Sequence, residues 1–407
     1  MAEPRCILHI GAPKCGSSAL QAALTAAPDH RDSSGQRYRY VGTGTVEGRI
    51  YPLYGGVVRR LGRSSEFGYS CWPNLRGLNL PQSGAADPVW AALQRVMQNA
   101  TRQNHVPMLS NEGWIGAAAA FGQGFLAKPG RRAEVVAFVR PPLDWVNAAY
   151  WQWGVWTGYG FRDWLRLSKM RYALGEQLTQ WAALDAVTLH VGGMGQDVVA
   201  GFGQRFGLDL ASGQAVNSAA SPAFIGLQLR HRKFRRDGHD SAVEFVLQRW
   251  CGRYTARKPW AIAPEDIAAV QAESAADVAA LLAVCAPGDA QALLQDPRWL
   301  SAEPYHRSTP PAPLSAQLED REGLAELHHA LLAGLRAAHA SARSKPPVLP
   351  PTPAVSADLQ VWDAALVPAL EALIAADLAV RNRLVFWRSK ARDLAGIYQR
   401  LKAGLRG

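Results

Sequence analysis

The residues best suited to chemistry lie in one glycine-rich stretch near the N-terminus, where residues 11–18 read GAPKCGSS. The stretch follows an apolar β-type run at residues 6–10 and precedes a helical pattern that starts at Ser17. Glycines let the backbone turn tightly so that successive amide groups point inward, and the following helix adds the positive end of its dipole. Lys14 and the hydroxyl groups of Ser17 and Ser18 complete the polar lining. The sequence therefore predicts an anion-binding loop, for which an ordinary glycine turn is the plainer alternative.

The order of residues in this loop differs from that of nucleoside triphosphatases. Their phosphate-binding loop reads G-x-x-x-x-G-K-[ST], with the lysine directly after the second glycine. Here Lys14 precedes Gly16, and two hydroxyl residues follow that glycine directly. The spacing therefore excludes a standard triphosphatase loop.

Two further segments place a charged residue at the end of an apolar strand pattern. The run VVAFV at residues 135–139 leads into Arg140, and the run VPMLS at residues 106–110 leads to Glu112. An arginine can bind a phosphate bidentately and keeps its charge at physiological pH. A carboxylate can take the proton of an acceptor hydroxyl as a general base. The alternatives are an arginine that starts a helix and a carboxylate that caps a strand end.

The loop resembles the 5′-phosphosulfate-binding loop of sulfotransferases that use 3′-phosphoadenosine 5′-phosphosulfate (PAPS), whose usual form is Pro-Lys-Thr/Ser-Gly-Thr/Ser-Thr/Ser. The resemblance implies that the donor is bound by Pro13, Lys14, Cys15, Gly16, Ser17 and Ser18. It also implies that Lys14 is catalytic, because its charge would stabilise the leaving 5′-phosphate oxygen. Cys15 departs from the pattern, since a hydroxyl residue usually stands there.

The segment around Arg140 resembles the 3′-phosphate-binding segment of the same family, in which an arginine and a serine eight residues later hold the phosphate. Arg140 matches the arginine, whereas Ala148 stands at the serine position, and its neighbour Asn147 is the candidate replacement. Glu112 matches the catalytic glutamate of carbohydrate-type sulfotransferases. The resemblance thus implies that Lys14 and Glu112 are catalytic and that Arg140 and Asn147 bind the donor.

The function implied is transfer of a sulfuryl group from PAPS to a hydroxyl or amine, with adenosine 3′,5′-bisphosphate as the product and no metal. The expected acceptor is a carbohydrate, a glycolipid, a surface-polysaccharide precursor or another small molecule. His9 and His105 are alternative bases. The alternative functions are a P-loop kinase and a non-catalytic protein that binds nucleic acid or a membrane. The net charge of +11 and the pI near 9.6 fit any anionic partner.

The elements that must position these residues alternate along the chain. Strand patterns at residues 106–110, 134–139 and 186–191 are separated by helical patterns at 143–156 and 196–206. Such alternation favours a parallel sheet covered on both faces. The predicted fold class is α/β, a P-loop-type three-layer fold with a central parallel sheet and a C-terminal helical extension. Its ligand should lie at the carboxyl ends of the strands.

The domain organisation follows from composition and periodicity. We predict a sulfotransferase domain at residues 1–300 with a variable insertion at 28–104, a helical segment at 301–344, a proline-rich linker at 345–356 and a C-terminal helical region at 357–407. The insertion lacks periodicity apart from a helical stretch near residues 89–102, and the likeness to bacterial members of the family extends weakly to residues 217–222.

Partners and location are less constrained by the sequence. The run RHRKFRR at residues 230–236 could close over the 3′-phosphate, contact an acidic acceptor or form a solvated surface. Leucines at alternating four- and three-residue intervals after residue 366 fit either a coiled-coil seam in a homodimer or packing against the catalytic domain. We expect no specific nucleic-acid partner, and the charge permits peripheral contact with a membrane. Without a signal-peptide or membrane-spanning pattern, and with five cysteines lacking metal-ligand spacing, we expect a cytoplasmic protein.

Overall fold

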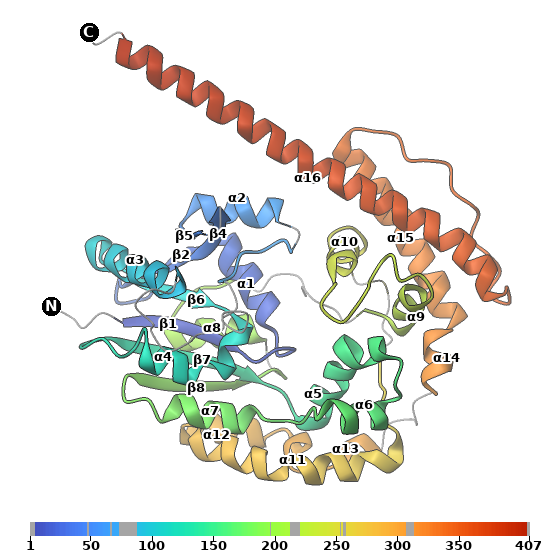
Figure 1. The fold of residues 1–407 in the computed structure, drawn as a ribbon, viewed down its shortest axis with the longest axis horizontal. Helices are drawn as coiled ribbons and strands as arrows, with labels where there is room; N and C mark the ends of the chain where they lie inside the picture. Colours follow the sequence, from blue (N-terminus) through green and yellow to red (C-terminus); the bar gives the residue numbers. More distant parts are fainter. Residues whose placement is uncertain are drawn as a thin grey trace.

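The computed structural model describes residues 5–46, 49–65, 67–72, 88–195, 197–211, 220–252, 254, 258–306 and 313–404, with the side chains of residues 46, 49 and 384–404 left out of the description. The chain forms a sheet-centred part and a helical part that faces the carboxyl ends of the strands (Figure 1).

A six-stranded sheet lies at the centre of the first part, in the order β2-β3-β6-β1-β7-β8. Its strands are β2 (Asp29–Arg31), β3 (Arg37–Tyr40), β6 (Val106–Ser110), β1 (Arg5–Gly11), β7 (Arg132–Val139) and β8 (Val187–Gly193). Neighbours from β3 to β8 pair in parallel, and β2 alone pairs antiparallel. The predicted α/β class with a mainly parallel sheet is confirmed.

Helices cover both faces of this sheet, which is why its central strands are mostly apolar and buried. On one face, α1 (Ser17–Ala26) and α8 (Val198–Phe206) pack together, with α2 (Gly56–Ser64) against α1. On the other face, α7 (Leu174–Ala182) packs against α4 (Ala118–Gln123) and α11 (Pro264–Val284). Figure 1 shows α11 and α12 (Pro287–Leu294) beyond the β8 edge.

Residues 28–104 do more than form a variable insertion. They supply β2 and β3 of the main sheet, a hairpin of β4 (Gly42–Val46) and β5 (Arg49–Leu53), α2, and α3 (Pro88–Gln103) at the predicted helical stretch. In β3, Tyr38 and Tyr40 are buried while Arg37 and Arg39, which alternate with them, are half-buried, which is the alternation of a strand with one covered face. This segment therefore belongs partly to the core of the fold.

The helical part has its own apolar core, made by α9 (Pro222–Arg230), α10 (Ala242–Cys251), α15 (Arg321–Ala342) and the first half of α16 (Leu359–Gly404). Because α9 and α10 belong to this core, it begins well before the predicted boundary at residue 300. The remaining short elements are α5 (Pro142–Ala149), α6 (Phe161–Ser168), α13 (Glu303–His306) and α14 (Leu314–Leu318). The predicted linker at 345–356 runs without helix or strand.

Helix α16 is fixed to the rest of the chain through a buried carboxylate. Asp377, which is fully buried, accepts hydrogen bonds from the guanidinium groups of Arg249 and Arg381 and from the indole of Trp250 at 2.8 Å. Beyond Arg383 the helix continues past α2 and away from the body (Figure 1). The first half of α16 therefore packs against its own chain, which is one of the two arrangements expected from the sequence.

Helix α11 is long and apolar enough to cross a membrane, with a window of mean hydropathy 1.5, although the sequence had indicated no such stretch. Here it lies against α7, where both carboxylate oxygens of Asp277 accept backbone hydrogen bonds, from Gly175 and Glu176, at 2.8 Å each. A Cβ atom on Gly175 would lie 2.0 Å from the carbonyl oxygen of Asp277, so the two helices are in close contact.

Candidate functional site

The glycine-rich loop lies where β1 ends, and two of its glycines are required by close contacts. Gly11 and Gly16 have φ values of 116° and 89°, in the region that favours glycine. A Cβ atom on Gly11 would lie 2.7 Å from the carbonyl oxygen of Glu112, and one on Gly16 would lie 2.9 Å from Val198. Gly16 is the N-cap residue of α1 and offers no side-chain cap, so the amino end of α1 faces the loop.

Lys14 lies at the centre of the site with φ 63°, and its ammonium group donates a hydrogen bond to the side-chain carbonyl of Gln152 at 2.5 Å. Burial lowers the pKa of Lys14 to about 8, and the positive charges of Arg235 and Arg140 add to this shift. The carboxylate of Glu112 opposes it. A partly desolvated ammonium group interacts strongly with an incoming anion, because its attraction is less screened than in water.

The two predicted serines contact groups on opposite sides of the loop. Ser17 donates a hydrogen bond from Oγ to the carboxylate of Glu112 at 2.6 Å. Ser18 shares a hydrogen bond at 3.1 Å with the hydroxyl of Tyr69, which follows α2. The structure therefore brings together the predicted loop and the predicted base.

Glu112 is held by a tight turn at the end of β6. The side chain of Asn111 accepts a hydrogen bond from the amide of Gly113 at 2.8 Å and donates one to the carbonyl of Trp72. The amide of Asn111 binds the carbonyl of His9 at 3.0 Å, which ties this turn to β1. Glu112 itself is exposed, so its carboxylate can be reached by an acceptor from solvent.

Arg140 follows β7 and is half-buried beside the loop, where its charge lowers the pKa of both Lys14 and Cys15. Its backbone carbonyl accepts a hydrogen bond from Tyr172 at 3.0 Å. Within the described part of the chain, no hydrogen bond or ion pair holds its guanidinium group. The group is thus available to an anion.

The side-chain amide of Asn147 is engaged in hydrogen bonds to the backbone of another segment. Its Nδ2 donates to the carbonyl of Pro259 at 2.9 Å, and its Oδ1 accepts from the amide of Ala261 at 2.8 Å. These two bonds fasten the segment around residue 260 to α5. Its role at the 3′-phosphate stays a prediction. One N–H of its side-chain amide is left to donate to a phosphate.

The thiol of Cys15 points into the core. The residue is fully buried, and burial raises the pKa of the thiol to about 12. The departure from the family pattern therefore removes no side chain from the loop lining. Nearby, the indole of Trp145 donates to the carbonyl of Pro13 at 3.1 Å, which fixes the loop against α5.

The alternative bases lie outside the loop. His105 is buried at the start of β6, at the opposite end of that strand from Glu112, and burial lowers its pKa to about 4. His9 is buried within β1, where it is bonded to Ser110 at 2.7 Å and burial lowers its pKa to about 3. Neither has the exposure of Glu112.

Gln152 is a site residue that the sequence did not reveal. It lies in a π-helical turn (Tyr150–Gly154) directly after α5, and such turns often re-aim side chains at functional sites. Its side-chain Nε2 donates to the carbonyl of Gly238 at 2.7 Å. Arg235 supports the same contact by donating to the carbonyls of Gln152 and Gly238 at 3.1 and 2.9 Å.

The basic run at residues 230–236 is mostly paired within the chain. Arg230 binds Asp363 of α16 through two hydrogen bonds at 2.9 and 2.7 Å, and Lys233 pairs with Glu371 of α16 at 2.7 Å. The guanidinium group of Arg235 is buried, pairs with Glu244 and lies 4.2 Å from the ring centre of Trp156. Arg230 and Lys233 therefore tie α16 to α9 within the helical part, and Arg235 connects that part to Trp156. The predicted likeness at 217–222 lies partly outside the described residues, and Ser221 caps α9.

A cavity of about 540 Å³ lies against β8 and α8 and reaches Pro141, the residue after Arg140. Its walls include the rings of Phe138, Phe202 and Trp299 and the bare backbone of Gly193. A cleft with aromatic walls suits a planar heterocycle.

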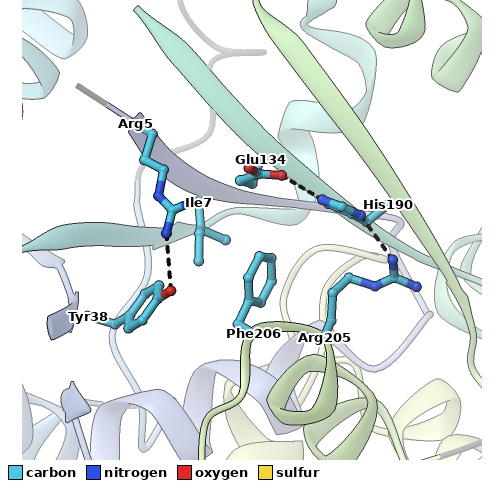
Figure 2. A pocket seen from close by; sticks show the side chains of 7 residues that line it. All are labelled: Arg5, Ile7, Tyr38, Glu134, His190, Arg205 and Phe206. Atoms are coloured by element: carbon cyan, nitrogen blue, oxygen red, sulfur yellow. Dashed lines mark hydrogen bonds and ion pairs between the residues drawn. The ribbon is translucent and has the colours of Figure 1, made fainter. Parts of the chain in front are cut away.

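A smaller cavity, of about 240 Å³, lies toward the amino ends of the strands (Figure 2). Its polar groups satisfy one another: Arg5 donates to the hydroxyl of Tyr38 at 3.2 Å, and His190 bonds Glu134 at 2.7 Å and Arg205 at 3.0 Å. Because Arg205 donates to Nδ1 of His190, the Nε2–H group donates to Glu134. This network is stabilising and lies away from Lys14.

Comparison with known proteins found one similar solved structure and no matching family model or curated protein. A solved structure, a sulfotransferase from Alicyclobacillus acidocaldarius, is similar with a TM-score of 0.32 and 16% identity, over 70% of this chain and 98% of that one.

Proposed function

We propose that this protein transfers a sulfuryl group from PAPS to a hydroxyl or amine acceptor. The observation that carries the proposal is the convergence of Lys14, Ser17 and Glu112 at one strand-to-helix loop, with the unpaired guanidinium group of Arg140 beside it among the described residues. The resemblance of the loop and strand-end motifs to sulfotransferases supports the same reading.

The donor would be bound by charges at two points. The 5′-phosphosulfate lies in the loop of Pro13–Ser18, where Lys14 and the amino end of α1 attract its negative charge. The 3′-phosphate lies near Arg140. The adenine enters the cavity beside Phe138 and Gly193.

The reaction needs one base and one stabilised leaving group. The acceptor oxygen attacks sulfur while Glu112 takes its proton, and the bond between sulfur and the 5′-phosphate oxygen breaks with its electron pair on that oxygen. The ammonium group of Lys14 stabilises the charge that develops there. Ser17, which bonds Glu112 in the free protein, links the base to the loop.

The acceptor approaches from the exposed side of Glu112. The carboxylate-based site favours a hydroxyl, which is a poor nucleophile without a base. A carbohydrate, glycolipid or surface-polysaccharide precursor is the class that we propose.

Calorimetric titration tests the proposal with three ligands: adenosine 3′,5′-bisphosphate, ATP with magnesium, and an oligonucleotide. We expect binding of the bisphosphate alone, weakened by about 10- to 100-fold in Lys14→Ala and in Arg140→Ala. Lys169→Ala is the matched control for the first variant. Lys169 is exposed, and its backbone has the same left-handed conformation as Lys14, with φ values of 53° and 63°. Arg132→Ala, at the other end of β7, controls the second.

Preference for ATP with magnesium would favour a kinase, and salt-sensitive binding of the oligonucleotide would favour a nucleic-acid-binding protein. Sulfuryl transfer is then measured as release of the bisphosphate from PAPS with candidate sugars. Glu112→Gln should keep nucleotide binding and lose about 10²–10⁴-fold in turnover, whereas Glu273→Gln on the outside of α11 should not. Full turnover in Glu112→Gln would remove Glu112 from the mechanism.

A further inference from the structure

The surface at α2 combines apolar and basic side chains that project from the fold. Tyr51, Val57, Leu61 and Phe67 are 42%, 38%, 36% and 47% exposed, all within one short stretch of the chain. Soluble proteins rarely gather large apolar side chains on an exposed surface without a partner. We call this group, together with Arg59, Arg60 and Arg63, the α2 face.

Basic side chains lie on the same helix as two of these apolar side chains. Arg59, Arg60 and Arg63 are exposed on α2, and the helix contains no acidic residue. Val57 and Leu61 lie one turn apart, and Leu61 shares its side of the helix with the buried Val58. Arg60 is the arginine one turn from Val57, while Arg59 and Arg63 lie on the opposite side. A short helix with an apolar side and several arginines is typical of proteins that lie on an anionic lipid surface.

The distal part of α16 is also basic in sequence. The helix contacts α2, and Arg249 links the two by pairing with Asp377 of α16 and donating to the carbonyl of Ser65 at 3.2 Å. In Figure 1, α16 runs past α2 and out from the body. The sequence of residues 384–404 holds five basic residues and a single acidic one.

We propose that the α2 face and the distal part of α16 bind the surface of a membrane rich in anionic lipids. This partner fits the charge of the surface, because each basic residue near an anionic membrane adds to the binding free energy. The apolar side chains can enter the lipid–water interface. The proposal goes beyond sulfuryl transfer, and it holds whether or not the loop binds PAPS.

Membrane binding through this face would bring the site close to lipid-linked acceptors. Helix α2 lies directly on α1, because a Cβ atom on Gly62 would lie 2.3 Å from Thr25. Tyr69, which follows the face, bonds Ser18 of the loop at 3.1 Å. The face is therefore one helix away from the anion-binding loop.

Co-sedimentation of the full chain with vesicles tests the proposal. We expect binding to vesicles of equal parts phosphatidylcholine and phosphatidylglycerol, little binding to phosphatidylcholine alone, and a loss of binding as salt is raised. Charge reversal of the three arginines of the α2 face to glutamate should weaken binding by about tenfold or more. The matched control reverses Arg132, Arg171 and Arg336, which are exposed elsewhere and change the net charge equally.

A second variant separates apolar contact from charge. Val57→Ser with Leu61→Ser keeps every charge and should also weaken vesicle binding, while thermal unfolding and nucleotide titration confirm that each variant is folded. Equal binding of the α2 variants and the control would overturn the proposal, as would equal binding to neutral vesicles. Self-association that the α2 variants abolish, without vesicle binding, would assign the face to a second copy of the chain and overturn it too.

Discussion

The ammonium group of Lys14 is held by the side-chain carbonyl of Gln152, across 138 residues of sequence, at 2.5 Å. Gln152 is itself fixed by its bond to the carbonyl of Gly238. The lysine therefore points in a set direction before any ligand enters, and the helical part of the chain takes part in setting it. This relationship makes Gln152 a positioning residue for the lysine.

Replacing Gln152 tests this positioning. Gln152→Ala should raise the Kd for adenosine 3′,5′-bisphosphate about 2- to 10-fold, the worth of one neutral hydrogen bond. Gln152→Glu should weaken binding further, because its carboxylate competes with the phosphate for Lys14. The added negative charge should also raise the pKa of Lys14, so the alkaline limb of binding should move to higher pH. A purely structural role would leave that limb in place.

Nucleotide binding should depend on pH through Lys14, whose pKa is lowered from 10.5 to about 8 by burial. Affinity for the bisphosphate should fall as pH rises through about 8, since the ammonium group is then lost, although bound phosphate will raise the midpoint. Lys14→Arg should bind without this limb, because a guanidinium group stays charged. Titrations from pH 6 to about 10 would check it, and an unchanged limb in Lys14→Arg would assign the limb to another group.

The lowered pKa of Lys14 also makes the free energy of unfolding depend on pH. Between pH 8 and 10.5 the unfolded chain keeps the lysine proton that the folded chain has lost, so the free energy of unfolding should rise with pH across this window. Below pH 8 the charged lysine is unfavourable to the fold. Lys14→Met should therefore stabilise the protein at neutral pH, and the gain should disappear at higher pH.

Cys15 should be structural, because its side chain is fully buried beneath the loop. Cys15→Ser introduces the residue type usual in the sulfotransferase loop that this one resembles, yet it would place a hydroxyl in the core and lower the free energy of unfolding by about 1–3 kcal/mol. The Kd for the bisphosphate should stay within about twofold, well below the loss of a charged contact. Urea unfolding and calorimetry measure the two quantities. A tighter Kd would show that a hydroxyl here reaches the ligand.

The sequence allowed prediction of the central strands and the loop because both depend on local patterns. Strand β6 has the predicted bounds, and Lys14 and Glu112 meet because parallel strands end at the same edge of the sheet. Strand β3 was missed, since its RYRY sequence is short and charged, although the alternation of tyrosines was a usable signal.

Long-range contacts explain the rest of what the sequence did not reveal. The position of Gln152 depends on a π-helical turn, and no residue spacing predicts such a turn. Arg230 and Lys233 of the basic run find their partners on α16, so their roles depend on how α9 and α16 pack. Similarly, the sequence gives no sign that Asn147 bonds the backbone around residue 260, because the two segments are brought together only by folding.

Asp377 should be essential for the docking of α16. Its buried carboxylate bonds Arg249, Arg381 and Trp250, and removing it would take a buried charged partner away from two guanidinium groups. Asp377→Ala should therefore lower the free energy of unfolding by about 3–5 kcal/mol. Glu371→Gln, which removes an ion pair between two half-exposed side chains, should cost only about 0–1 kcal/mol.

Chemical denaturation of both variants decides between two views of the helix. If α16 is an integral part of the fold, Asp377→Ala shifts the single unfolding transition of the whole chain, because its core is shared with α9 and α10. If the helix were an independent appendage, the main transition would stay unchanged while a separate helical signal was lost early. In the first case Asp377→Ala also loosens the contact between α16 and α2, so vesicle binding should fall together with stability.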